Sequence, residues 1–477
     1  MACFVSTAIP YVNAKPHIGH ALEYVQADAY VRALRIDGED IFFLTGTDDN
    51  ALKNVQAAET AGVPIQDYVA ENAENFVELD KRLNVVYDDF IRTSTDPRHR
   101  AGVEKLWRAT NQKDIYKKSY RGFYCVGCEE FKIEKNLING ECPEHPGKRL
   151  EEVEEENYFF HLSAYKDILL ELIESDKLKI IPESRKNEIT SFIRSGLEDF
   201  SVSRTAARAK GWGIPVPDDP NQYLYVWYDA LANYITALGY SGDADTYEKY
   251  WVSAKNKTHI IGKGINRFHT VYWPAMLLSA GVPLPTEVFV HGYVISGGQK
   301  MSKSIGNVID PNELIDRYGT DAVRYFLLRH GHPTEDFDLT DERCREWYTA
   351  NLTNGLGNLV ARVMKLAEDH AVVTPRVKST RRSSMPQITE AIETFKFNDA
   401  MDAIWNRIQR LDKRINEEEP YKVIKTDPVT GKILIQFMVS ELREIGEMLA
   451  PLMPETSQKI LDAIKANKKP ENLFPRL

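Results

Sequence analysis

The sequence has none of the features that mark membrane or secreted proteins. It contains no run of about 18 consecutive apolar residues, the length that a membrane-spanning helix needs. Its first residues do not follow the charged and then apolar order of a secretory signal peptide. Five cysteines among 477 residues do not suggest a disulfide framework. We therefore expect a cytoplasmic protein that does not associate with membranes.

The glycine-rich fingerprint of dinucleotide-binding enzymes is also missing. The nearest candidate, Gly355-x-Gly357, has Val360 where the third glycine belongs and no predicted strand before it. We therefore do not expect a nicotinamide or flavin enzyme.

Basic residues do not outnumber acidic ones. The net charge of −10 argues against a general nucleic-acid coat protein. A local basic track remains open, either at Arg92, Arg98 and Arg100 or at residues 376–382. With 43% hydrophobic and 27% charged residues, the chain has the composition of a soluble protein and the length of roughly three domains.

Strand-like and helix-like segments alternate in residues 1–115. Short apolar runs at 2–10 and 40–49 predict strands, and amphipathic patterns at 64–84 and 98–112 predict helices. This order favours an α/β fold with a doubly wound, parallel, Rossmann-like sheet. Ligands of such sheets bind at the carboxyl ends of the strands.

The rest of the chain divides into three parts. Residues 116–220 hold cysteines, short aromatic segments and an acidic run at 151–157, which we interpret as a solvated edge or a linker. Alternation resumes in residues 221–344, which we interpret as the second half of the same sheet. Residues 345–477 show helical patterns with few strand signals. The sequence thus predicts a sheet split by an insert and followed by an all-α bundle.

Two histidines lie on either side of a glycine where the first helix is expected to begin. Pro16 suits the first turn of this helix, and Gly38 offers a stop. His17 and His20, three residues apart, share one face of that turn, and Gly19 leaves room for a ligand near the backbone. Helix N-termini that follow strands bind phosphate in many α/β folds. The alternative is a pair of surface histidines that cap the helix.

A second stretch, SGGQKMSKS at 296–304, combines two glycines with two lysines. Gly297 and Gly298 allow the loop to move, and Lys300 and Lys303 place two cations in one short turn. A lysine-bearing surface loop is the simpler interpretation. Together with the histidine turn, the stretch predicts a lid that closes positive charge over a triphosphate.

Four potential metal ligands form two close pairs in the expected insert. Cys125 and Cys128 are followed, after thirteen residues, by Cys142 and His145. Three thiolates and one imidazole suit tetrahedral zinc and leave no open position for catalysis. Coincidence or a pair of disulfides is the alternative. We expect one structural zinc ion per chain, which would hold together an insert with little core of its own.

The motifs at residues 17–20 and 300–304 match the two hallmark motifs of the class I aminoacyl-tRNA synthetases. Within this class the chain is similar to the methionyl-tRNA synthetases from the first strand to its end. The other matching stretches are the cysteine pairs and residues 7–20, 154–163, 225–231 and 268–276. The resemblance implies a catalytic nucleotide-binding domain in two halves, 1–115 and 221–344, a connective domain with a zinc knuckle at 116–220, and an anticodon-binding domain at 345–477.

The resemblance also implies the reaction. Such enzymes activate methionine with ATP to methionyl-adenylate and pyrophosphate, and then transfer methionine to the 3′ end of a tRNA with a CAU anticodon. By the family's pattern, His17, Gly19, His20, Lys300 and Lys303 bind ATP, and the two histidines and two lysines among them act in catalysis. Mg²⁺ accompanies the ATP.

A pocket for methionine is implied in the same way. Asp48 is the carboxylate for the ammonium group, and an apolar, aromatic wall suits the thioether. Without the resemblance we interpret Trp227, Tyr234 and Trp273 as core aromatics. The full set of expected pocket residues is Ile9, Tyr11, Trp227, Ala230, Leu231, Tyr234, Ile265, His269 and Trp273.

Three residues of the helical tail are expected to face the anticodon. Asn358 and Arg362 are four apart on one helix face, and Tyr421 occupies a position where the family usually has tryptophan. A solvated polar edge is the alternative for the first two. Many relatives carry a further C-terminal module, and the chain stops at Leu477 without one, so we expect a monomer.

Two departures lie close to the expected active site. The family usually reads Asp-Glu-His-Gly where this chain has Asp48-Asp49-Asn50-Ala51, and it has aspartate at the position of Gly264. They leave two other hypotheses open. One is a class I synthetase for leucine, isoleucine, valine or cysteine, although the insert is short for an editing domain. The other is a non-catalytic tRNA-binding or regulatory paralogue.

Overall fold

A computed structural model describes most of the chain, in two compact units. It covers residues 2–125, 127, 130–132, 137–143, 147, 150–242, 244–301, 307–372 and 386–477, with backbone only at 130, 131, 300 and 386. The first unit comprises Met1–Pro16, Asp40–Glu78 and Tyr87–His291, and the second comprises His17–Glu39, Leu79–Val86 and Gly292–Leu477.

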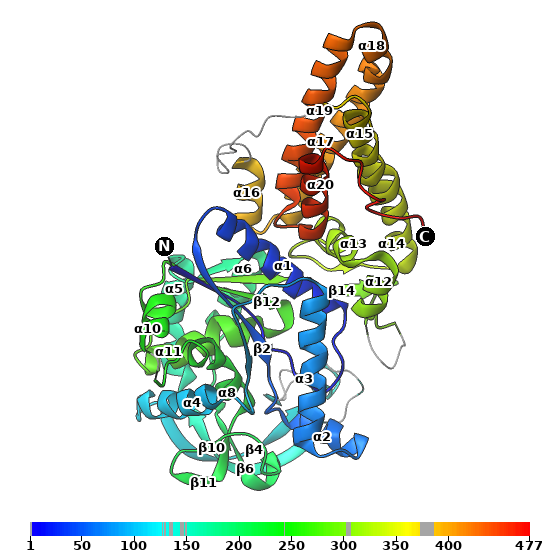
Figure 1. The fold of residues 1–477 in the computed structure, drawn as a ribbon. Helices are drawn as coiled ribbons and strands as arrows, with labels where there is room; N and C mark the ends of the chain where they lie inside the picture. Colours follow the sequence, from blue (N-terminus) through cyan, green and yellow to red (C-terminus); the bar gives the residue numbers. More distant parts are fainter. Residues whose placement is uncertain are drawn as a thin grey trace. The chain divides into compact units, whose positions relative to one another are not determined.

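A six-stranded parallel sheet forms the centre of the first unit (Figure 1). In spatial order its strands are β3 (Asp89–Arg92), β2 (Asp40–Thr47), β1 (Ala2–Thr7), β12 (Asn256–Gly262), β13 (Glu287–His291) and β7 (Lys179–Ile181). Strand order reverses between β1 and β12, and ligands of such sheets bind at this point, outside the carboxyl ends. The predicted parallel, Rossmann-like sheet is confirmed. Its edge strand β7 comes from within residues 116–220.

Helices and turns of the first unit surround one continuous apolar core, to which the inner strands contribute Phe4, Leu44, Ile261 and Val290. The helices are α2 (Leu52–Ala61), α4 (Pro97–Ala109), α5 (Lys166–Glu174), α6 (Glu183–Arg194), α7 (Ala206–Ala209), α8 (Val226–Leu231), α9 (Asn233–Thr236), α10 (Ala244–Tyr247) and α11 (Trp273–Ser279), while α3 (Ile65–Arg82) runs through both units. Short helical segments precede and follow β12, at Glu248–Val252, Lys263–Ile265 and Phe268–Tyr272.

Two smaller antiparallel sheets also belong to this unit. One contains β5 (Glu130–Lys132), β4 (Ile115–Cys125), β6 (Glu151–Phe160) and β8 (Phe200–Ser201), and the other β10 (Pro215–Val216), β11 (Asp219–Leu224) and β9 (Ser203–Thr205). The acidic run 151–157 lies inside β6 and pairs along its length with β4, so the interpretation as a linker is wrong. The run is solvated, as expected, since Glu151, Glu152, Glu154 and Glu156 are exposed. Burial of Val153 and Asn157 and an ion pair between Arg121 and Glu152 explain why so acidic a segment is a strand.

The second unit is mainly helical, as expected for residues 345–477. Its helices are α1 (Ile18–Ile36), α12 (Pro311–Tyr318), α13 (Thr320–Tyr325), α14 (Asp341–Trp347), α15 (Asn358–Asp369), α16 (Pro386–Glu393), α17 (Phe397–Glu418), α18 (Pro420–Thr426), α19 (Pro428–Leu449) and α20 (Pro454–Ala466). Helical segments at Phe326–His330 and Tyr348–Gly357 continue α13 and α14. A small sheet holds β15 (Gln299–Lys300), β14 (Val294–Ser296) and β16 (Phe337–Asp338).

A buried ion pair ties together separate segments of the second unit. Arg324 and Asp28 are both fully buried, with 2.8 Å between Nη2 and Oδ2. The same guanidinium donates to the backbone carbonyl oxygens of Leu83 and Leu452. In this way α1, the 79–86 segment and the loop before α20 share one charged group.

Within the described ranges, no helix combines the length and apolarity that crossing a bilayer demands.

Candidate active site

A small cavity of about 20 Å³ lies where β1 and β12 end, beside the point of strand reversal. Residues that follow β1 and β12 line it together with one face of α8 and α9. The lining residues are Ala8, Ile9, Trp227, Ala230, Leu231, Asn233, Tyr234, Ile265 and His269. Seven of these belong to the expected methionine pocket, although they come from three separate segments of the sequence.

Aromatic rings form most of the wall of this cavity. Trp227 stacks on Phe268 with 3.8 Å between the ring centroids and 4° between the planes. Tyr11 meets the edge of Trp227, and Trp273 packs against Tyr234 at 6.1 Å, fully buried. Tyr11 and Trp273 do not line the cavity and instead support the rings that do.

The imidazole of His269 is neutral. Burial lowers the pKa of His269 to about 4. Its Nδ1 lies 3.0 Å from the carbonyl oxygen of Ile265, which can only accept, so Nδ1 carries the proton and Nε2 accepts from the Tyr234 hydroxyl at 2.7 Å. The cavity therefore places no positive charge next to an apolar side chain.

Asp48 is buried just beyond the end of β2, with 2% of its surface exposed. Its backbone N–H donates to the carbonyl oxygen of Pro10, and its Oδ1 accepts the N–H of Asn50 at 3.2 Å. The Asn50 side chain donates to Oδ2 of Asp229 at 2.7 Å, and the other oxygen of Asp229 pairs with Nε2 of His99 at 2.6 Å. Asn50, one of the residues that differ from the family's usual pattern, thus holds the loop around Asp48 through hydrogen bonds.

Asn233 lines the cavity but was not expected from the sequence. Its amide N–H donates to the carbonyl oxygen of Ala230 at 2.6 Å, which fixes the orientation of the side chain. Its Oδ1 is buried and has no hydrogen-bond partner among the residues that the structure describes. A buried acceptor without a donor costs about 1–3 kcal/mol. A ligand with an N–H group would remove that cost. In the sequence, the only sign that Asn233 lines the cavity is its position two residues after Leu231, an expected pocket residue.

The three arginines proposed as a basic track are paired with carboxylates. Arg92 contacts Asp49 at 3.0 Å, and Arg98 contacts Asp96 at 2.6 Å and also Asp89. Arg100 pairs with Glu104. The positive charges of these three arginines are therefore balanced by neighbouring carboxylates. The other candidate, residues 376–382, lies outside the described residues.

In the second unit, His17 and His20 form the N-terminal cap of α1. His17 is the N-cap, so Pro16 precedes the helix and the expectation that it begins the first turn is wrong. The Gly19 N–H donates to Nδ1 of His17, and the His17 N–H donates to Nδ1 of His20, both at 3.1 Å. The rings stack at 3.9 Å. Because Nδ1 accepts in each ring, Nε2 carries the proton of the neutral imidazole and is a donor.

Gly19 also has a role in the cap itself. A Cβ at this position would lie 2.9 Å from Cε1 of His17, so the missing side chain makes room for the capping ring. The N–H groups of Ile18 and His20 are also bonded, to the carbonyl oxygens of Ile309 and His17. An anion at this turn therefore meets imidazole N–H groups before backbone ones.

The glycine pair before the lysines forms a tight hairpin. β14 and β15 pair with Ser296 opposite Gln299, which leaves Gly297 and Gly298 as a two-residue turn with φ of +61° and +75°. Positive φ at both positions is the reason that glycine is needed here. Lys300 ends β15. Lys303, with residues 302–306, lies outside the described residues.

Two of the four expected zinc ligands are described, and both are buried. Cys125 ends β4, and Cys142 follows the turn between Ile138 and Glu141; each has 1% of its surface exposed. Cys128 and His145 lie outside the described residues. Within the described part of the chain, no group of three or more potential ligands is present. Both are sulfur donors of the kind that zinc prefers.

The expected anticodon residues lie on α15 and α18. Arg362 donates to Oδ1 of Asp412 at 2.7 Å and to Oδ1 of Asn416 at 2.8 Å, both on α17. Asn358 begins α15, one turn earlier. Tyr421 is 40% exposed on α18, close in sequence to the end of α17. Arg362 is thus half-exposed on α15, and Tyr421 is exposed on α18.

Comparisons with known proteins agree with these features. The family described as "tRNA synthetases class I (M)" matches residues 3–152 and 146–364. The methionine–tRNA ligase of Caldanaerobacter subterraneus is 42% identical, over 97% of this chain and 73% of that protein. The methionine–tRNA ligase of Brucella suis is 41% identical, over 98% and 92%. The methionyl-tRNA synthetase of Mycobacterium tuberculosis, solved with methionyl-adenylate, superposes with a TM-score of 0.90 at 36% identity, over 99% of this chain and 98% of that chain.

Proposed function

This chain belongs to the methionyl-tRNA synthetase family of class I tRNA synthetases, and we propose how its residues perform the family's reaction. It is a methionine–tRNA ligase: methionine and ATP give methionyl-adenylate and pyrophosphate, and methionine then passes to the 3′ end of its tRNA. We assign the binding of methionine to the cavity beside the ends of β1 and β12, because seven of the expected methionine-binding residues line it. The similarity over nearly the full length decides against the other class I synthetases.

We assign the methionine side chain to this site. Its cavity of about 20 Å³ has room for little more than a water molecule, so the rings that line it must move apart when methionine binds. Stacked rings and a neutral imidazole suit an unbranched, polarizable thioether, because sulfur makes favourable contacts with aromatic rings. Asp48 is assigned to the ammonium group, and the hydrogen bonds of Asn50 hold its loop. The residues assigned to contact methionine are Ile9, Asp48, Trp227, Ala230, Leu231, Tyr234, Ile265 and His269. Tyr11 and Trp273 are assigned to support the rings of Trp227 and Tyr234.

The first step needs little base catalysis. The methionine carboxylate is already ionised and attacks the α-phosphorus of ATP, while pyrophosphate leaves. The barrier comes from negative charge gathered around phosphorus, which fixed donors and cations stabilise. We propose that the imidazole N–H groups of His17 and His20 donate hydrogen bonds to phosphate oxygens of ATP. Lys300 and Lys303 bind the departing pyrophosphate. Mg²⁺ enters with ATP and neutralises part of its charge.

A structural zinc ion is proposed for the insert. Cys125, Cys128, Cys142 and His145 would hold it, and the burial of the two described cysteines supports this. The ion would fix the end of β4 and take no part in the reaction, because four protein ligands leave no open position.

Recognition of the tRNA is assigned to the second unit. We propose that Asn358, Arg362 and Tyr421 contact a CAU anticodon, since unpaired bases are read by hydrogen bonds and stacking. We further propose a cytoplasmic monomer, with catalytic halves at 1–115 and 221–344, a connective domain at 116–220 and an anticodon-binding domain at 345–477.

The experiment that tests this function is charging of a tRNA with a CAU anticodon. We expect methionine to be esterified to this tRNA, and a tRNA that differs only in its anticodon to be charged far more slowly. Equal charging of both would contradict the assignment of the anticodon.

A further inference from the structure

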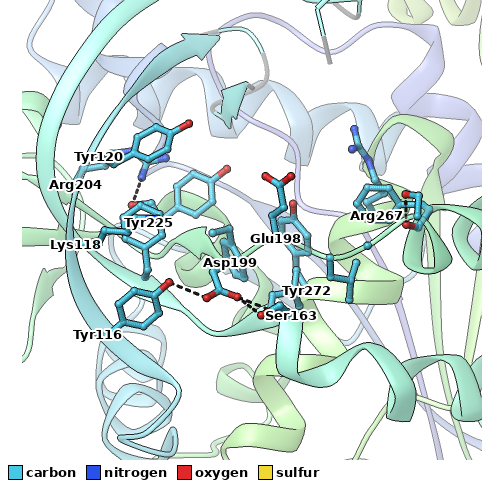
Figure 2. Close-up of a pocket in the computed structure, with 18 residues that line it drawn as sticks. Tyr116, Lys118, Tyr120, Ser163, Glu198, Asp199, Arg204, Tyr225, Arg267 and Tyr272 are labelled. Carbon is cyan, nitrogen blue, oxygen red and sulfur yellow. Dashed lines mark hydrogen bonds between the residues drawn. The ribbon is translucent and has the colours of Figure 1, made fainter. Parts of the chain in front are cut away.

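Asp229 on helix α8 is a buried carboxylate that the proposed reaction does not use. Its exposed surface is 1%, and it lines neither the methionine cavity nor the larger cavity of about 500 Å³ that Figure 2 shows in the same unit. Tyr225, the residue before α8, lines that larger cavity, whereas Trp227 and Leu231 on α8 line the smaller one. A buried carboxylate needs hydrogen-bond partners inside the protein, and those of Asp229 connect two parts of the site.

The first partner is His99 on α4, which is fully buried. Its Nε2 lies 2.6 Å from Oδ1 of Asp229, and Nε2 is the donor because a carboxylate can only accept. The other ring nitrogen, Nδ1, lies 2.9 Å from the hydroxyl oxygen of Thr236 on α9. Helices α4 and α9 pack closely here, since a Cβ at Gly102 would lie 2.4 Å from Cγ2 of Thr236. The His99 ring is therefore held at both nitrogens in one orientation.

The second partner is Asn50, in the loop after β2. Its side-chain N–H donates to Oδ2 of Asp229 at 2.7 Å, and its backbone N–H donates to Oδ1 of Asp48 at 3.2 Å. Asn54 on α2 fixes the backbone of the same loop, because its side chain donates to the carbonyl oxygens of Asp48 and Asp49 at 3.0 and 2.9 Å. The carboxylate assigned to the ammonium group of methionine is thus connected through Asn50 to Asp229.

Asp229 thereby joins the two groups that a bound methionine must meet at once. Helix α8 carries part of the apolar wall for the thioether, and the Asp229 side chain on that helix holds the loop that carries Asp48. Binding groups work only when their own neighbours hold them within about 0.5 Å of the productive geometry. The distance from the wall to the Asp48 carboxylate therefore depends on the contacts of Asp229.

We propose that Asp229 and His99 are positioning residues, which hold Asp48 at the correct distance from the apolar wall and so set the affinity for the ammonium group of methionine. The inference rests on the proposed function, because it requires Asp48 to bind that group. Neither residue lines the methionine cavity, so both act through Asn50. Two donors orient the Asp229 carboxylate, and removal of either one leaves a buried oxygen without its partner.

The first test measures the KM for methionine in ATP–pyrophosphate exchange. We expect Asn50→Ala and Asp229→Asn each to raise it by roughly tenfold, as loss of a hydrogen bond to a charged group does. The kcat should change by less than about twofold, because the contact with the ammonium group is the same before and during attack on phosphorus. The matched control is Tyr165→Phe, which removes a 2.6 Å hydrogen bond to the buried Asp114 in the same unit and should change neither constant.

The second test separates the positioning of Asp48 from a collapse of the apolar wall. Desamino-methionine has a hydrogen in place of the ammonium group and keeps the thioether and the carboxylate. Its inhibition constant in exchange should differ by less than about twofold between the unaltered protein and the Asn50→Ala and Asp229→Asn variants, because it offers no group to Asp48. If the analogue loses as much affinity as methionine, the network only supports the wall and the proposal is wrong.

His99 is tested by rescue and by a double-mutant cycle. His99→Gln keeps an N–H for the Asp229 carboxylate and should retain more affinity for methionine than His99→Ala. In the Asn50→Ala background, His99→Ala should have little further effect on KM, because the connection to Asp48 is already broken. A full additional effect would show that His99 acts elsewhere. Should His99→Ala fail to fold, Asp229→Asn completes the same cycle with Asn50→Ala.

The outcomes separate this inference from the proposed function. No exchange with methionine in the unaltered protein would overturn the proposed function itself. Normal exchange in the unaltered protein, with an unchanged KM for methionine in both Asn50→Ala and Asp229→Asn, would overturn only the positioning role. A lower kcat with an unchanged KM would place the network in the chemical step and would also contradict the proposal.

Discussion

Single residues decide the electrostatic character of the methionine cavity. His269 is fixed between an acceptor, the Ile265 carbonyl, and a donor, the Tyr234 hydroxyl, so its two nitrogens are satisfied only in the neutral form. His259 is also fully buried, and burial lowers its pKa well below the usual value. Both rings must therefore lose stabilising contacts or become hydrated before they can take up a proton.

This arrangement predicts a loss of stability in acid. In the unfolded chain His269 takes up a proton near pH 6.5, and in the folded protein only near pH 4. The unfolded state thus binds more protons between these values, so stability falls as the pH falls through this window, by about 3 kcal/mol for this residue. Urea unfolding at pH 7 and pH 4.5 measures it. The His269→Gln variant should lose less stability over the same interval, and equal losses in both proteins would contradict the account.

Asn233 gives a second prediction at this scale. If its buried Oδ1 accepts a hydrogen bond from the bound amino acid, Asn233→Ala should raise KM for methionine in exchange by a factor that corresponds to about 1–3 kcal/mol. Asn233→Asp keeps an acceptor but loses the amide N–H that donates to the Ala230 carbonyl, so it shows what that contact contributes. An unchanged KM in the alanine variant would show that Asn233 only supports the turn after α8.

The residues of the site differ in how far sequence alone could identify them. Asp48 is recognisable as an acid just beyond a buried strand. Trp227 and Tyr234 have the pattern of core aromatics, because a ring that lines a small cavity is as buried as one that fills the core. Asn233 could not be found, since its signal is an unmatched atom and not a residue pattern.

At the scale of elements, α1 combines capping with the proposed chemistry. The sequence left open whether His17 and His20 cap a helix or bind phosphate, and the capping geometry is present. It does not exclude the second role, because the capping hydrogen bonds involve only Nδ1 of each ring.

A substitution at the cap can separate these two roles. Asparagine is also a good N-cap, so His17→Asn should change the free energy of unfolding by less than about 0.5 kcal/mol. The same variant loses the imidazole donor, and we expect exchange to slow by about 100-fold or more. An exchange rate close to that of the unaltered protein would assign His17 to capping alone.

The contacts of α15 give a prediction for the tail. Arg362→Ala should reduce kcat/KM for a CAU tRNA in charging by a factor that corresponds to roughly 1–3 kcal/mol and leave exchange nearly unchanged. The control is Arg407→Ala on α17, which removes an arginine of similar exposure that pairs with Glu441 and Glu444. If both variants affect both assays equally, Arg362 stabilises the bundle and the anticodon assignment is wrong.

At the scale of the whole molecule, alternation of strands and helices predicted the main sheet correctly. Its composition was harder to predict. Three residues of β7 join the sheet from inside the expected insert, a pairing too short and too distant along the chain to leave a pattern. The strand β6 was not predicted because its many glutamates obscure the alternation of buried and exposed residues. The pairing with β4 that produces this alternation cannot be seen in the sequence.

The most direct test of the central claim is ATP–pyrophosphate exchange with each of the twenty amino acids. The account predicts that methionine supports the fastest exchange and that leucine and isoleucine support little. An unbranched analogue such as norleucine should react measurably, because a difference of this size in an apolar pocket is worth only about 1–3 kcal/mol. Faster exchange with any other proteinogenic amino acid, or none with methionine, would contradict the account.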